Sequence, residues 1–153
     1  MRTSLVKIIA TGLGFGYLKP FAGTWGTIPG IVLCYFIYPL GIIYQAGTIV
    51  LLFIISVWAS GRGENYFGHD NKKIVIDEIL GASVTLFLIP NPRAWQYYLL
   101  GFVLFRIFDV AKLEPAKASE KLAGGWGVTM DDFIAAIYAN ITLQLLARFI
   151  IKV

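Results

Sequence analysis

A stretch of 42 residues without a charged side chain, Pro20 to Gly61, constrains the fold of this chain more than any other feature. A membrane-crossing helix needs about 20 apolar residues, so this stretch is long enough for two such helices. Its most polar point is the segment Gln45–Thr48, and we expect the chain to turn there, with spans over residues 28–44 and 48–60. Pro39 lies inside the first expected span, where a proline kinks a helix.

Shorter apolar segments cover residues 79–92, 94–105 and 133–147. The first two flank an Asn-Pro-Arg turn signal at residues 91–93, and segments this short form either tilted spans or a re-entrant hairpin. The third predicts a final span. We therefore expect an all-α, multihelical integral membrane protein with four to five membrane segments, forming a single domain over residues 1–153.

The composition supports a membrane protein and excludes several other classes. Of 153 residues, 58% are hydrophobic and 14% are charged, whereas soluble domains contain about 45–50% and about 25%. The same values exclude intrinsic disorder. A single cysteine, Cys34, excludes an intramolecular disulfide and a cysteine-rich zinc site. The net charge of +4 is not gathered in one basic patch, so no nucleic-acid partner is expected.

The charged residues divide unequally between the two sides of the expected topology. Residues 1–27, 61–78 and 106–132 share one side, which carries all nine carboxylates and ten of the thirteen lysines and arginines. The positive-inside rule makes that side cytoplasmic, which predicts a multi-pass protein of the cell (inner) membrane with these segments facing the cytoplasm. Such a face is either a functional site or simply the solvated side of the protein.

The segment IVIDEILG, residues 74–81, places Asp77 and Glu78 where an apolar segment begins. Two carboxylates at a membrane boundary are costly unless they meet water, a cation or a metal ion. The alternative is that they cap the N-terminus of a helix.

The segment FRIFDVAK, residues 105–112, spaces Arg106, Asp109 and Lys112 three residues apart, so all three lie along one face of a helix. Arginine suits bidentate contact with a phosphate, and lysine adds a point charge. The alternative is an intrahelical ion pair just beyond the membrane edge.

Glycine-rich segments supply the remaining candidates. In GGWGVTMDD, residues 124–132, Gly124 and Gly125 predict a loop that brings backbone N–H groups close to a ligand. Asp131 and Asp132 then open the last helix, either as its cap or as hard oxygen ligands that favour Mg²⁺. Earlier in the chain, Thr24 offers a hydroxyl group to an anion, although the surrounding glycines do not form a nucleotide-binding loop.

Taken together and in this order, from about residue 12 to 138, these motifs resemble those of the phosphatidylglycerophosphatase A family of bacterial membrane phosphatases. The resemblance implies Mg²⁺-dependent removal of the terminal phosphate from phosphatidylglycerophosphate, a membrane phospholipid substrate, in phospholipid biosynthesis. On this basis we expect Asp77, Glu78, Asp131 and Asp132 to form a metal site, with Asp109 as a further ligand or a base. The implied catalytic residues are Asp77, Arg106, Asp109 and Lys112, and the implied substrate-binding residues are Gly23, Thr24, Arg106, Lys112, Gly124 and Gly125.

Two other functions remain open at this point. One is a phosphatase of a different lipid phosphate, such as phosphatidic acid or a prenyl phosphate. The other is a cation-binding membrane protein without enzymatic activity, although carboxylates at the ends of the spans, rather than inside them, argue against an ion pathway. The sequence leaves open the number of metal ions, the choice between direct attack by water and an aspartyl-phosphate intermediate, and the oligomeric state.

Overall fold

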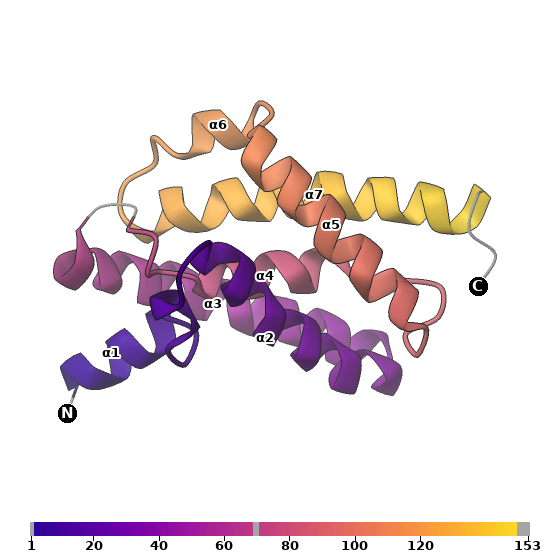
Figure 1. Ribbon diagram of the computed structural model, residues 1–153, viewed down its shortest axis with the longest axis horizontal. Coiled ribbons are helices and arrows are strands. Elements are labelled where there is room, and N and C mark those ends of the chain that lie inside the picture. The colour runs from indigo at the N-terminus through magenta and orange to yellow at the C-terminus, as the bar shows by residue number, and fades with distance from the viewer. Residues whose placement is uncertain (1, 69–70, 150–153) are drawn as a thin grey trace.

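The computed structural model of the protein describes residues 2–68 and 71–149 (Figure 1). Asp70 and Lys152, which contribute to the predicted charge asymmetry, lie outside the described residues. All regular structure in the described part is helical, which confirms the all-α prediction. The elements are α1 (Arg2–Ala10), η1 (Phe15–Tyr17), α2 (Ala22–Ile37), η2 (Tyr38–Leu40), α3 (Ile42–Phe67), α4 (Ile76–Thr85), α5 (Trp95–Ala111), α6 (Ala116–Ser119) and α7 (Gly125–Phe149).

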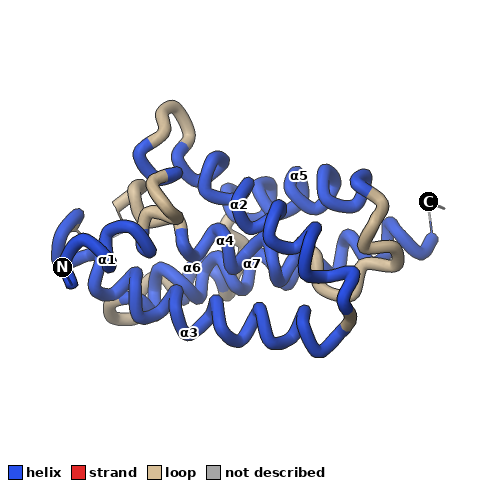
Figure 2. Tube along the Cα trace, turned by 90° about the horizontal axis from the view of Figure 1, so that it is seen from below, coloured by secondary structure: helices blue, strands red, loops and turns tan. Residues whose placement is uncertain are grey.

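The short helix α4 lies at the centre of the bundle. Helices α2, α4 and α7 run in one direction and α3 and α5 return in the other, so that α4 packs against all four of its neighbours (Figures 1 and 2). Every residue of α4 from Ile79 to Thr85 is buried. At 1.5 Å per residue, its ten residues extend about 15 Å, half the hydrocarbon thickness of about 30 Å that a spanning helix must cross.

The predicted turn at residues 45–48 is wrong. The chain turns earlier, through η2, so Pro39 lies in the turn rather than kinking a spanning helix. Proline lacks an N–H donor, and Gly41, with φ of 118°, adopts a conformation that side-chain-bearing residues rarely reach. Residues 45–48 instead lie in the first turns of α3.

Three buried or half-buried amide side chains, Gln45, Asn140 and Gln144, support the backbone where α4 ends; we refer to them as the amide cluster. Asn140 Nδ2 donates to the carbonyl oxygens of Thr85 and Phe87 at 2.9 and 2.8 Å. Gln144 Nε2 donates to the carbonyls of residues 87 and 88, and Gln45 Oε1 accepts the N–H of residue 88. These side chains replace the hydrogen bonds that a continuing helix would make, so the backbone keeps hydrogen-bond partners where α4 ends.

By length and apolar composition, α3 is the one helix in the described residues that qualifies by itself as a membrane span. The expected four to five spans are therefore not confirmed. Large apolar side chains are nonetheless exposed along the outer surfaces of several helices, including Phe36 on α2, Ile54 on α3, Leu99 on α5 and Ile141 on α7. Exposed apolar surface of this extent is typical of a protein that contacts lipid or another apolar partner.

Candidate active site

A pocket of about 300 Å³ lies where α2, α4 and α7 begin and α5 ends. Five carboxylates line it, together with three cationic side chains, and we refer to it as the carboxylate pocket. Its charged residues are Lys72, Asp77, Glu78, Arg106, Asp109, Lys112, Asp131 and Asp132, and its other lining residues are Phe21, Ala22, Gly23, Asn71 and Ile74.

Most of the predicted site residues meet in this pocket, although they come from four separate segments of the chain. All five predicted metal-binding carboxylates and both predicted phosphate-binding cations line it, as does Gly23. Thr24, Gly124 and Gly125 are not among its lining residues. The structure thus brings the charged candidates together, whereas their chemical roles stay predictions.

Asp77 and Glu78 occupy the first turn of α4, where the positive end of the helix dipole favours negative charge. Neither is the helix cap, because the N-cap position is Val75 and makes no side-chain capping bond. Asp77 is buried, and its Oδ1 accepts the backbone N–H of Glu78 at 3.1 Å. The capping alternative is therefore wrong for this pair, and both carboxylates are directed into the pocket.

Arg106 joins two of the carboxylates across helices. Its Nη1 lies 2.5 Å from Glu78 Oε2 on α4 and 2.8 Å from Asp109 Oδ2 one turn further along α5. Thr27 on α2 also donates to Glu78 Oε2, at 3.2 Å. The intrahelical ion pair considered as an alternative is therefore present, between Arg106 and Asp109. The same guanidinium also pairs with Glu78 and so links α5 to α4.

Gly23 provides the space for this ion pair. A Cβ atom at position 23 would lie 2.0 Å from Glu78 Oε1 and 3.0 Å from Arg106 Nη1. The glycine that was predicted to bind substrate therefore also has a packing role. The preceding Phe21 has a left-handed φ of 64°, a conformation that is strained for a residue with a side chain.

Lys112 forms a second ion-pair group at the end of α5. Its Nζ donates to Asp131 Oδ2 at 2.9 Å and to the Glu120 carboxylate that follows α6. Lys112 is the C-cap of α5, with φ of 44°. Its left-handed conformation turns the chain toward α6, so the segment after α5 reaches the start of α7.

The prediction of a glycine loop before the last helix is largely wrong. Only Gly124, with φ of 59°, precedes α7, which begins at Gly125 rather than at the aspartates. Gly125 lies against α3, where an added Cβ would approach the carbonyl oxygen of Val57 to 2.0 Å. Asp131 and Asp132 consequently lie in the second turn of α7 and are both buried. Neither residue caps the helix.

The electrostatics of the pocket disfavour full ionisation of its carboxylates. Burial and neighbouring carboxylates raise the pKa of Asp77 and of Asp132 well above the usual range. Burial raises the pKa of Glu78 to about 7, although the nearby Arg106 guanidinium opposes that shift. Burial also raises the pKa of Asp131, against the lowering effect of Lys112. A bound cation would relieve this mutual repulsion.

The donor chemistry of the pocket fits Mg²⁺, which prefers carboxylate oxygens. In the described part of the chain, Asp131 Oδ1 and Asp132 Oδ2 are buried without a hydrogen-bond partner, and buried charges normally have one. No three acidic, histidine or cysteine side chains among the described residues converge as a ready-made metal site. Arg106 and Lys112 instead hold three of the five carboxylates.

Sequence reasoning missed several residues that complete this region. Thr27 and Glu120 contact the charged groups directly, and Phe21, Asn71 and Lys72 line the pocket. Only Lys72 gave a signal, because it lies in a basic pair shortly before the Asp-Glu motif. The others become neighbours of the site only through the packing of distant segments.

Comparisons with known proteins agree with the motifs. The family model described as Phosphatidylglycerophosphatase A matches residues 8–147. A Haemophilus influenzae protein named Phosphatidylglycerophosphatase A is 36% identical over 90% of this chain and 86% of its own length. The Escherichia coli protein of the same name is 31% identical over 85% of this chain and 76% of its own length.

A third relative has a different name. It is a Bacteroides thetaiotaomicron protein named "Putative phosphatidylinositol-3-phosphatase", 34% identical over 96% of both chains. No solved structure matches this chain. The family model covers nearly the whole chain, and the relatives match it along most of their length, so this protein belongs to the phosphatidylglycerophosphatase A family and is a phosphatase.

Proposed function

We propose that the protein hydrolyses the terminal phosphate of phosphatidylglycerophosphate to give phosphatidylglycerol, with Mg²⁺ as its cofactor, in phospholipid biosynthesis. The observation that carries this proposal is the carboxylate pocket, where five acidic side chains and three cationic ones meet at one end of an apolar helix bundle. A phosphomonoester is highly charged, and the acidic excess of this pocket would repel it. A cation in addition to the protein's own arginine and lysines would offset this repulsion and favour substrate binding.

The carboxylates Asp77, Glu78, Asp109, Asp131 and Asp132 would hold the metal ion, with the unpaired oxygens of Asp131 and Asp132 the most readily available. When bound, Mg²⁺ neutralises charge on the phosphoryl oxygens and makes water a stronger nucleophile at neutral pH.

Arg106 and Lys112 are the residues that we assign to the phosphate. Both already lie at the pocket and both are fixed by carboxylates, Arg106 by Glu78 and Asp109, and Lys112 by Asp131 and Glu120. Arginine donates two hydrogen bonds in the geometry of two phosphate oxygens. As substrate binds, these cations would exchange carboxylate contacts for phosphate contacts, which stabilises the charge of the transition state.

We also place the protein in the cell membrane, with the pocket at the cytoplasmic surface. The apolar helix α3 and the exposed apolar side chains of α2, α5 and α7 support a multi-pass arrangement. In this arrangement α4 enters the membrane and stops halfway, because ten residues are too few to cross it. The excess of lysine and arginine on the pocket side supports the cytoplasmic orientation.

The decisive experiment measures inorganic phosphate release from phosphatidylglycerophosphate in neutral detergent micelles. We expect release with Mg²⁺, none with excess EDTA, and a loss of release in an Asp131→Asn variant. Glu114→Gln is the matched control, because Glu114 is exposed and does not line the pocket. Release that survives both EDTA and Asp131→Asn would retain the phosphatase and overturn the metal site.

A second candidate substrate, phosphatidylinositol 3-phosphate, is suggested by the Bacteroides relative, which is named "Putative phosphatidylinositol-3-phosphatase". The same assay should therefore include phosphatidylinositol 3-phosphate and phosphatidic acid. If either lipid is hydrolysed with a higher kcat/KM than phosphatidylglycerophosphate, our assignment of the substrate is wrong. Binding of Mg²⁺ without release from any of the three would favour the cation-binding alternative.

A further inference from the structure

A second and larger pocket, of about 640 Å³, adjoins the carboxylate pocket and has the opposite charge. Among the residues that the structure describes, its charged lining residues are all cationic: Lys19, Lys72 and Lys73, which define what we call the lysine groove. The two pockets share four lining residues, namely Phe21, Ala22, Asn71 and Lys72. An anion bound in the groove would therefore lie beside whatever occupies the carboxylate pocket.

Two segments that are distant in the sequence form this groove by close approach. Gly16 in η1 lies directly against residue 73, since an added Cβ would be 2.1 Å from the Lys73 carbonyl oxygen. On the other side, Asn71 Oδ1 accepts the Lys73 N–H at 3.1 Å and Asn71 Nδ2 donates to the Phe67 carbonyl at 2.7 Å. These contacts fix the turn that carries Lys72 and Lys73, which line the groove together with Lys19.

The lysine ammonium groups are available to a ligand. Across the described residues, no ion pair joins Lys19, Lys72 or Lys73 to a carboxylate, and all three side chains are exposed. Lys73 Nζ lies 5.7 Å from the ring centres of both Tyr17 and Phe67, so aromatic faces hold it without neutralising it. Arg106 and Lys112 in the neighbouring pocket, by contrast, are each paired with two carboxylates.

We infer that the lysine groove binds the phosphodiester group of the lipid substrate while its terminal phosphomonoester occupies the carboxylate pocket. This inference rests on the proposed function, since phosphatidylglycerophosphate carries both groups, joined by a glycerol. A phosphodiester has a single negative charge, which unpaired lysines can bind without a metal ion. A lipid with a phosphomonoester alone, such as phosphatidic acid, cannot occupy both pockets, so the groove contributes to headgroup selectivity.

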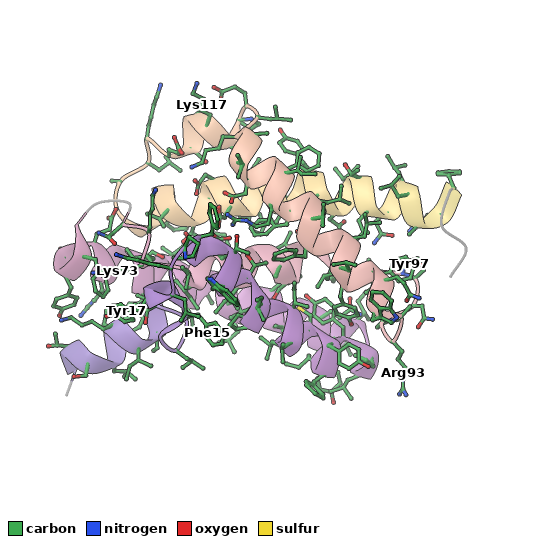
Figure 3. The ribbon with its side chains drawn as sticks, viewed as in Figure 1. Phe15, Tyr17, Lys73, Arg93, Tyr97 and Lys117 are labelled. Atoms are coloured by element: carbon green, nitrogen blue, oxygen red, sulfur yellow. The ribbon has the colours of Figure 1, made fainter. Side chains whose placement is uncertain are left out.

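The test uses a Lys19→Gln/Lys73→Gln double variant, because these two lysines line only the groove, whereas Lys72 also lines the carboxylate pocket. Substitution of Lys117, an exposed lysine on α6 that lines neither pocket, is the matched control for charge (Figure 3). In neutral detergent micelles we expect the KM for phosphatidylglycerophosphate to rise about tenfold in the double variant, with kcat within twofold. Lys117→Gln should leave both constants unchanged, and a thermal melt confirms that each variant is folded.

A binding measurement separates this inference from the proposed function. Native mass spectrometry of the wild-type protein should show retention of phosphatidylglycerol, the diester probe, and the double variant should lose that retention about tenfold. Diester binding that depends on the lysines without any hydrolysis would support the groove and overturn the proposed function. Hydrolysis by the double variant with an unchanged KM would overturn the role of the groove. An equal loss of phosphatidylglycerol and phosphatidic acid binding would also overturn it, because the lysines would then only attract anionic lipid surfaces.

Discussion

The two ends of α4 contain polar clusters that differ in charge: carboxylates gather at its beginning and neutral amides at its end. At its beginning, the carboxylate pocket gathers five acidic side chains and leaves oxygens of Asp131 and Asp132 without partners in the described structure. At its end, the neutral amide cluster supplies hydrogen bonds to a backbone that has left the helix. We therefore expect the carboxylate pocket to lower the stability of the ligand-free protein and the amide cluster to raise it. Uncharged oxygens of Ser60, Thr85 and Gln144 are also buried without a partner in the described structure, so the convergence of buried carboxylates, rather than unsatisfied groups as such, marks the functional site.

The strongest test of this contrast is Asp132→Asn. Asparagine has nearly the same shape but no charge, so we expect a loss of kcat of roughly 10²–10³-fold, as for removal of one electrostatic group from an active site. The metal-free variant should also melt at a higher temperature than the wild type, because Asp132 is buried among other carboxylates. Phosphate release and a thermal melt provide the two readouts. A variant that loses stability together with activity would show that Asp132 has a structural role instead.

The pH dependence of the metal-free protein gives the next largest effect. The folded-state pKa of Glu78 is raised from 4.5 to about 7. The contribution of Glu78 to stability is therefore complete below pH 4.5 and is lost as the pH rises through about 7. We expect the melting temperature in EDTA to fall between pH 5 and 8, equivalent to a loss of about 3 kcal/mol at 1.4 kcal/mol per pH unit.

Saturating Mg²⁺ should flatten this pH dependence, because a bound cation stabilises the ionised carboxylates. A melting temperature in EDTA that rises over the same pH range would contradict the charge distribution described for the pocket.

At the other end of α4, Asn140→Leu should show the reverse pattern. The substitution leaves the Thr85 carbonyl without its donor, whereas the Phe87 carbonyl keeps Gln144. One unsatisfied buried carbonyl costs about 1–3 kcal/mol. We expect the free energy of unfolding to fall by that amount in a denaturant titration, with kcat per folded molecule nearly unchanged. Gln96→Leu, at an exposed amide on α5, is the control. If its free energy of unfolding falls by a comparable amount, the amide cluster has no special role in stability.

The smallest effect is expected for Gly23→Ala. The added Cβ would approach Glu78 Oε1 to 2.0 Å and displace the ion pair between Glu78 and Arg106. We expect kcat/KM to fall about tenfold, which is about 1.4 kcal/mol, with little change in melting temperature. Gly47→Ala is the matched control, because position 47 in α3 has open space around it and alanine favours a helix. Equal activity in both variants would show that the ion pair tolerates displacement.

Several properties of this protein could be predicted from the sequence alone. The charge-free stretch and the apolar segments predicted the helical fold, because backbone periodicity and hydrophobicity are local properties. The spacing of Arg106 and Asp109 predicted a common helix face, which their ion pair confirms, since residues three apart lie one turn from each other. Lys112, which was predicted on the same face, is instead the left-handed C-cap beyond the end of α5. The motifs, read in order, also identified the family that the comparisons support.

Other features were decided by the tertiary structure. Gln45 appeared in the sequence to be a polar turn residue, yet it is buried in α3, where it accepts a hydrogen bond from residue 88. The same holds for Glu120 and Thr27, whose contacts with Lys112 and Glu78 join segments 8 and 51 residues apart. Local patterns report how a segment folds, but a polar side chain far from its partner in sequence finds that partner only when the helices pack. The adjacency of the lysine groove and the carboxylate pocket is likewise a product of that packing.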